Sequence, residues 1–261
     1  MKSTIISVLF VVILFFSVSG VVSGAADEAS ETDKNSSPFN LTFSIESEGG
    51  SGSTSSVLKI ALFLTLMSIL PGLLMSMTSF LRIIIVLSFL KQAMGTPQMP
   101  PNQIVVGIAI FLTMYVMAPV WTEINTNAIQ PYVNKEISEK EAFTRGLEPL
   151  RSFMLHQTRE DDIALFLGIS KSPRPENIND IPTTILIPAF ITSELKTAFQ
   201  MGFILYLPFI VIDAVISTTL TAMGMFMLPP VMISLPFKLV LFVLADGWRL
   251  VIQTVVSSFR Y

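Results

Sequence analysis

Apolar residues dominate the chain in long runs that carry no charge. The run from Ile60 to Leu81 covers 22 residues, which is long enough for a helix that crosses a membrane. Pro71 and Gly72 lie near its middle, and a proline inside a helix removes a hydrogen bond and bends the axis. Because apolar residues continue to Leu90, the pattern predicts one long broken helix or two helices joined at a kink.

A loop and a second apolar run follow. The loop from Gly95 to Pro101 contains three prolines in seven residues. The second run extends from Ile104, or from Asn102, to Val120 and ends near Pro119. Together these runs predict an apolar helical hairpin over residues 57–120.

Residues 121–183 differ because charged side chains gather there. Seven Lys or Arg and ten Asp or Glu fall between residues 121 and 180. Ser138 and Glu141 have the spacing of a capping box, which predicts the start of a helix, and a second helix is predicted over residues 159–170. The first helix has an apolar face formed by Phe143, Leu147, Leu150 and Met154. We predict a small soluble helical domain inserted between the apolar segments.

Residues 184–261 are again mostly apolar, but helix-breaking residues interrupt them. These residues are Pro188, Gly202, Pro208, Gly224, Pro229, Pro230, Pro236 and Gly247. The pattern predicts several broken helices. Because non-helical backbone at membrane depth is stable only where protein or a water-filled cavity meets it, this region is expected to pack against other chains or to line a pore.

The motif GMFMLPP, residues 224–230, lies in the longest charge-free run of this region, the 24 residues between Asp213 and Lys238. Its glycine and double proline oppose a helix, although its other residues suit an apolar helix. The motif therefore predicts a loop that is formed by Gly224, Pro229 and Pro230 and presents Met225, Phe226 and Met227.

The N-terminus has the pattern of a cleaved signal peptide over residues 1–25, with Lys2 before an apolar stretch and small residues at the cleavage site. A retained first span is the alternative, although the apolar stretch is shorter than a span needs. Residues 26–56 are rich in Ser, Gly, Asp and Glu, which is typical of a disordered linker.

Composition favours an all-α membrane protein and gives no support to an enzyme. Hydrophobic residues make up 51% of the chain and charged residues 13%, and the net charge of −3 does not suggest nucleic-acid binding. With no cysteine and one histidine, a transition-metal site is not expected. Neither G-x-S-x-G nor a P-loop motif occurs, so no catalytic residue, metal or cofactor is predicted.

Isolated charges in the apolar segments are candidate functional residues, because an ionisable group inside a membrane segment is costly. They are Arg82, Glu194, Lys196, Asp213, Lys238 and Asp246. Pairing between subunits of a packed assembly is the favoured interpretation. The alternative places some of them at helix ends in the membrane interface, with Lys238 snorkelling and Asp246 paired locally with Arg249.

Three long stretches resemble the FliP family of flagellar biosynthetic proteins. They are residues 188–248, with SELKTAF, GMFMLPP and LPFK, residues 77–104, with MTSFLRIII and GTPQMPPNQ, and residues 147–162, LEPLRSFMLHQTREDD. The resemblance covers the chain from about Leu58 to its end.

The resemblance implies a structural subunit of the flagellar type III protein export gate, in the bacterial inner membrane and flagellar basal body with a periplasmic portion. Several copies would assemble with FliQ-like and FliR-like subunits into a pore for unfolded flagellar proteins. The family's methionine-rich pore loop falls on residues 225–227, where Phe226 replaces the usual central methionine. These side chains would act as a soft gasket that closes the pore to ions.

Two alternative functions remain at this point. One is the related export-gate subunit of an injectisome. The other, from a different class, is a small-solute or proton-coupled transporter, since such proteins use broken helices and ionisable residues at the membrane midplane. Asp213 would then be the coupling residue.

Overall fold

The computed structural model describes residues 53–95, 100–170 and 177–259. The chain separates into two compact units, Met1–Ser56 and Val57–Tyr261. The predicted signal peptide and most of the predicted linker, up to residue 52, lie outside the described residues. The described residues belong to the unit Val57–Tyr261, apart from residues 53–56 at the start of its first helix.

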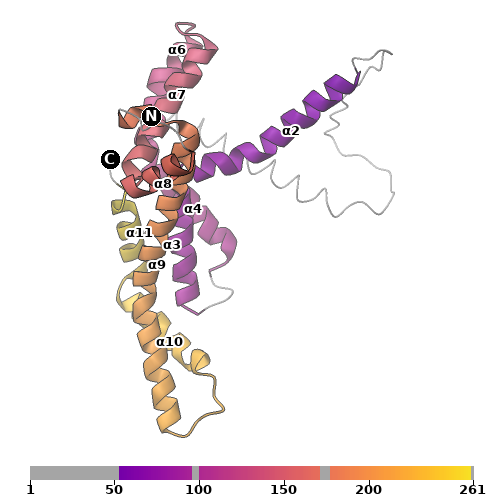
Figure 1. Ribbon diagram of the computed structural model, residues 1–261. Coiled ribbons are helices and arrows are strands. Elements are labelled where there is room, and N and C mark those ends of the chain that lie inside the picture. Colours follow the sequence, from indigo (N-terminus) through magenta and orange to yellow (C-terminus); the bar gives the residue numbers. More distant parts are fainter. Residues whose placement is uncertain (1–52, 96–99, 171–176, 260–261) are drawn as a thin grey trace. The chain divides into compact units, whose positions relative to one another are not determined.

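Every regular element in the described residues is a helix, so the predicted helical class is confirmed for this part of the chain (Figure 1). The elements are α2 (Ser53–Ser76), α3 (Phe80–Ala93), α4 (Asn102–Val116), α5 (Ala118–Ile124), the π-helix η1 (Asn125–Ile129), α6 (Gln130–Val133), α7 (Glu139–Gln157), α8 (Glu160–Ser170), the 3-10 helix η2 (Ile178–Asp180), α9 (Thr183–Ala222), α10 (Pro230–Leu244) and α11 (Gly247–Ser257).

The packing of α3 along α9 forms the centre of the fold. On α3, the buried side chains recur at helical spacing and include Ile83, Val86 and Leu90. They meet Leu186 and Phe190 of α9 in one hydrophobic core. Full burial of such a side chain contributes about 1.5–3 kcal/mol, so this seam fixes α3 and α9 as a pair, against which α4, α7, α8 and α10 pack.

The break between the first two helices lies later than predicted. Pro71 is inside α2, which continues to Ser76, and the chain turns at residues 77–79 before α3 begins. At the turn, the Thr78 hydroxyl donates to the carbonyl oxygen of Met75 and accepts from the backbone N–H of Phe80. These bonds of the Thr78 side chain offer the backbone an alternative to the helical hydrogen bonds at the turn.

The second apolar run is a bent pair of helices. α4 begins at Asn102, the earlier of the two predicted starts, and makes an angle of 56° with the following helical stretch Ala118–Val133, which begins with α5. Pro119 occupies the second position of α5 and has no N–H to continue the α4 ladder. The proline near the end of the run therefore causes the bend.

α7 has the predicted N-cap: the Ser138 hydroxyl accepts a hydrogen bond from the backbone N–H of Glu141 at 3.3 Å. Leu150 and Met154 of its apolar face are buried, but Phe143 is 73% exposed. The buried residues belong to the same core as Ile83 and Phe190. The predicted inserted domain thus shares its core with the apolar helices.

α9 corrects the prediction that helices break at Pro188, Gly202 and Pro208. It is one helix of 40 residues that contains Pro188, Gly202 and Pro208. Each proline removes one hydrogen bond, whereas leaving the helix in an apolar segment would strand many more backbone groups. One hydrogen bond lost at a proline therefore costs less than the unpaired backbone groups that a helix break in an apolar segment would create.

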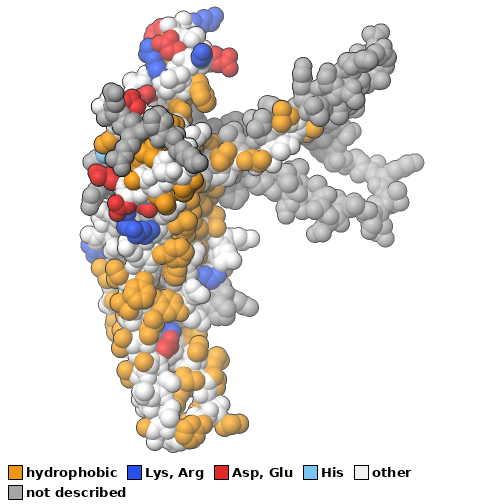
Figure 2. Space-filling model, viewed as in Figure 1, with side chains coloured by type: hydrophobic (Ala, Val, Ile, Leu, Met, Phe, Trp, Pro, Cys, Tyr) orange, Lys and Arg blue, Asp and Glu red, His pale blue; other side chains and the backbone are white. Residues whose placement is uncertain are grey.

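By length and composition, α9 is the one helix of the described residues that could cross a membrane alone. Two bent pairs, α4 with α5–α6 and α10 with α11, would raise the number to three if each pair formed one span. Figure 2 shows hydrophobic side chains gathered over α9 and α10, and charged side chains around α6 and α7. These surfaces suit an apolar and an aqueous environment, respectively.

Candidate functional site

The loop between α9 and α10 begins with a C-terminal cap of α9 that consists of two backbone hydrogen bonds. The backbone N–H of Met225 donates to the carbonyl oxygen of Leu220 at 2.9 Å, and that of Gly224 donates to Thr221 at 3.0 Å. This pair of bonds is a Schellman motif, whose left-handed position favours glycine. Gly224 has φ +76°, so the residue at this position allows the chain to leave α9 at Ala222.

Prolines set the other end of the loop. Pro229 has an extended backbone with φ −67° and ψ 118°, and Pro230 is the first residue of α10. A proline is well tolerated at the first helical position, because its missing N–H has no partner there in any helix. Gly224 and Pro229–Pro230 therefore bound a seven-residue connection, residues 223–229.

The side chains of this connection are apolar and exposed. Met225 is 39% exposed, Phe226 77% and Met227 96%. Neighbouring large apolar side chains that face solvent usually mark a surface that contacts something else. The loop can therefore offer a flexible, polarizable and uncharged contact surface.

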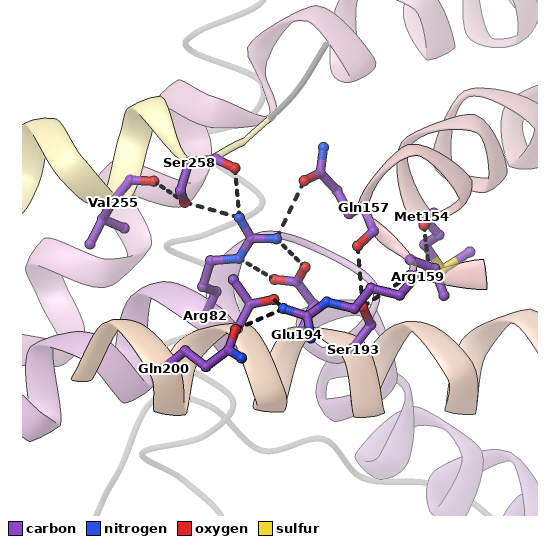
Figure 3. A network of polar contacts seen from close by, with 11 residues as sticks. Arg82, Met154, Gln157, Arg159, Ser193, Glu194, Gln200, Val255 and Ser258 are labelled. Carbon is purple, nitrogen blue, oxygen red and sulfur yellow. Dashed lines mark hydrogen bonds and ion pairs between the residues drawn. The ribbon is translucent and has the colours of Figure 1, made fainter. Parts of the chain in front are cut away.

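Two of the candidate charges, Arg82 of α3 and Glu194 of α9, form a buried ion pair (Figure 3). The Nε of Arg82 donates to one carboxylate oxygen at 2.8 Å, and Nη2 donates to the other. The two side chains are 3% and 0% exposed. This bidentate geometry is the strongest that a guanidinium and a carboxylate can adopt.

Other elements complete the surroundings of Arg82. Nη1 donates to the carbonyl and hydroxyl oxygens of Ser258 at 3.0 and 2.9 Å, and Nη2 donates to Gln157 at 3.3 Å. The guanidinium carbon lies 4.1 Å from the centre of the Phe259 ring, a distance that gives a cation–π attraction. Arg82 thus connects α3, α7, α9 and the residues after α11.

A second ion pair joins α9 to α10. Nζ of Lys238 lies 2.6 Å from Asp213, whose other oxygen accepts from the Ser234 hydroxyl at 2.6 Å. Nζ also donates to the carbonyl oxygen of Ala93 at 3.3 Å. Since Ala93 ends α3, the cation lies at a helix C-terminus, where a positive charge is favourable.

The remaining candidate charges are at the surface. Lys196 is exposed, and no ion pair of Lys196 occurs among the residues that the structure describes. Asp246 has φ +50° and lies 3.8 Å from Arg249, with both side chains more than half exposed. The structure therefore pairs Arg82 with Glu194 and Asp213 with Lys238 inside one chain, and leaves Lys196 on the surface.

Sequence reasoning missed several partners of these charges. Ser234 precedes Lys238 by four residues, a spacing that puts both on one face of a helix. Gln157 follows Met154 by three residues and so extends the apolar face of α7. Both signals were present in the sequence. Ser258 and Phe259 had none, because only the packing of α11 brings them to Arg82.

The fold and the site define a class: a helical protein with a helix able to span a membrane, buried ion pairs between helices and an exposed apolar loop. The chain belongs to the FliP family, whose model matches residues 63–255. Among similar proteins is the flagellar biosynthetic protein FliP of Bacillus subtilis, 49% identical over 221 residues that cover 85% of this chain and 100% of the relative.

Two further relatives carry the same name. The protein of Pectobacterium carotovorum is 50% identical over 211 residues, 81% of each chain. That of Treponema denticola is 42% identical over 269 residues, 99% of each chain. The similarity to flagellar biosynthetic proteins therefore includes both the helical core and the loop region.

Proposed function

We propose that this chain is a structural subunit of the flagellar protein export gate, and that several copies assemble with FliQ-like and FliR-like subunits around a pore. Family membership and the flagellar relatives support the flagellar role over that of an injectisome component. The proposed location is the bacterial inner membrane at the flagellar basal body. The charged region around α6 and α7 would then be periplasmic.

The exposed apolar loop is the observation that carries the pore proposal. Met225, Phe226 and Met227 project from a connection that both of its ends force out of the helix. Copies of this loop around an axis would form an apolar ring, and a hydrophobic constriction can block ions by dewetting. Flexible methionines would let the ring widen around an unfolded chain.

An ion-leak measurement tests the gasket. Alanine at all three loop positions, in cells that assemble the complex, should increase membrane conductance because the ring loses its bulk. Phe111→Ala is the matched control, since Phe111 is an apolar side chain of α4 with 67% exposure. An unchanged leak in the triple variant would overturn the gasket proposal.

Lys196 is the charge of α9 best placed to pair between copies, because it is exposed, whereas Glu194 and Asp213 of the same helix pair within the chain. Lys196→Glu should lower the fraction of the chain that is assembled. The measurements are the yield and the mass of the purified complex. Lys140→Glu, an exposed lysine in the charged region, is its control. A complex of unchanged mass and yield in Lys196→Glu would contradict a role in assembly.

A further inference from the structure

The ion pair between Asp213 and Lys238 includes two contacts that a simple charge pair would not need. Both oxygens of Asp213 are occupied, one by Ser234 and one by Lys238, each at 2.6 Å. Ser234 and Lys238 are one helical turn apart on α10. One carboxylate of α9 is therefore held between two successive turns of α10.

This arrangement specifies the register of the two helices. If α10 slid along α9 by one turn, about 5 Å, the carboxylate could keep at most one of the two partners. Burial strengthens this preference on the α10 side, since Ser234 is fully buried and the Lys238 side chain is 4% exposed, whereas the Asp213 side chain is 35% exposed. An ammonium that lost its carboxylate there would remain desolvated and unpaired.

Register determines where the exposed loop lies. From Asp213 to the end of α9 at Ala222 is a rise of about 14 Å, whereas from Ser234 back to the start of α10 at Pro230 is about 6 Å. Residues 223–229 must bridge this difference of about 8 Å. A slip by one turn would change the offset by more than half, and so move Met225–Met227 along the helix axis.

The third contact ties the hairpin to the rest of the fold. Lys238 donates to the last carbonyl of α3, at Ala93, and α3 is the helix that packs along α9 in the core. The ammonium is thus shared by three helices. It relates the position of α10 both to α9 and to the rigid core.

We propose that Asp213, Ser234 and Lys238 form a register clamp that positions the apolar loop, and that Ser234 is a positioning residue of the candidate gate. The consequence of the clamp, the height of the gasket in the pore, rests on the proposed function. The helix register itself does not. The clamp and the gasket can therefore fail separately.

Distance measurement between spin labels tests the clamp. The chain contains no cysteine, so Met227→Cys and Ser88→Cys give two unique labelling sites, one in the loop and one on the exposed side of α3. Labelled chain is diluted with unlabelled chain in the assembled complex so that distances within one copy dominate. The unsubstituted clamp should give a single narrow distance distribution.

Ser234→Ala and Asp213→Asn supply the clamp variants. Ser234→Ala, which deletes one hydroxyl, should add a second population displaced by about 5 Å, and Asp213→Asn should increase that population. Ser234→Thr should restore the narrow distribution. Thr218→Ala is the control, because the Thr218 hydroxyl bonds only to carbonyls of its own helix.

The outcomes separate the two proposals. A distribution unchanged in both Ser234→Ala and Asp213→Asn would overturn the clamp, whatever the ion leak. A displaced loop in Ser234→Ala with an unchanged ion leak supports the clamp and counts against the gasket. A displaced loop with an increased leak supports both.

Discussion

Arg82 illustrates how a charge can be stable inside an apolar core. A guanidinium has five N–H donors, and five hydrogen bonds leave it, two to Glu194, two to Ser258 and one to Gln157. Its face is covered by the Phe259 ring. Such a network specifies one arrangement of its helices, because every alternative leaves a buried charge without a partner.

Removal of the carboxylate tests this network at the residue scale. Glu194→Gln should lower the free energy of unfolding by about 3–5 kcal/mol, because Arg82 stays buried without its counter-charge. The measurement is denaturant unfolding of the purified protein in detergent, followed by tryptophan fluorescence. Replacement of both partners, Arg82→Met with Glu194→Leu, should recover much of the loss.

The exposed pair Glu141–Arg145 is the matched control, with an N–O distance of 2.7 Å and both side chains 49% exposed. Glu141→Gln should cost at most about 1 kcal/mol, because water screens the pair. Equal losses in Glu141→Gln and Glu194→Gln would contradict the role given to burial.

At the scale of elements, local signals predicted where helices start better than where they stop. The capping-box spacing predicted the start of α7, which Ser138 caps, and Asn102, the earlier of two possible starts for the second apolar run, is the first residue of α4. Pro188 and Pro208 were expected to end helices and do not. A cap acts on its own turn, whereas the effect of a proline depends on how much apolar helix surrounds it.

The crossing of α3 and α9 depends on the absence of a side chain at Gly202. A Cβ there would lie 2.6 Å from Cγ and Cδ2 of Phe89 and 3.0 Å from its Cβ. Gly202→Ala should therefore lower the unfolding free energy by about 1–3 kcal/mol, measured by the same denaturant unfolding. Phe89→Leu in the same chain should relieve part of the clash.

Gly107 of α4 provides the opposite case, because a Cβ there meets no atom within 4 Å. Gly107→Ala should raise the unfolding free energy by about 0.5–1 kcal/mol through the higher helix propensity of alanine. A similar gain in Gly202→Ala would show that α3 and α9 do not pack closely at Gly202.

Gly224 has a conformational role and no packing role. Its φ is +76°, but a Cβ would meet nothing within 4 Å. Gly224→Ala should therefore destabilise the end of α9 by about 1 kcal/mol through backbone strain, and Gly224→Asn by less, because asparagine tolerates this conformation. Hydrogen exchange of the Met225 amide, which donates to Leu220, should quicken in the order Gly, Asn, Ala, and equal rates would exclude strain as the cause.

At the scale of the whole molecule, the sequence identified the buried charges but not their partners. Arg82 and Glu194 are 112 residues apart, and Lys238 is 145 residues from Ala93. Helical spacing can relate residues within one element, as for Ser234 and Lys238. Which helices meet depends on the fit of their whole surfaces, so pairing across such separations has no local signature.

The residues after α11 close the core from the opposite end of the chain. The Phe259 ring is 6% exposed, and its centre lies 6.3 Å from that of Phe153 in a stacked arrangement. It also covers the Arg82 guanidinium. Phe259 therefore connects α3 and α7 to the C-terminal helix and should stabilise all three together.

Phe259→Ala should lower the unfolding free energy by about 3–5 kcal/mol, because a buried ring is lost and a cavity opens beside a buried charge. Hydrogen exchange should quicken together in α3, α7 and α11, since all three depend on the ring. Phe143→Ala, at a phenylalanine of α7 with 73% exposure, should change neither measurement. Faster exchange confined to α11 would mean that Phe259 stabilises only the C-terminal helix. It would also mean that the Arg82 network does not depend on the Phe259 ring.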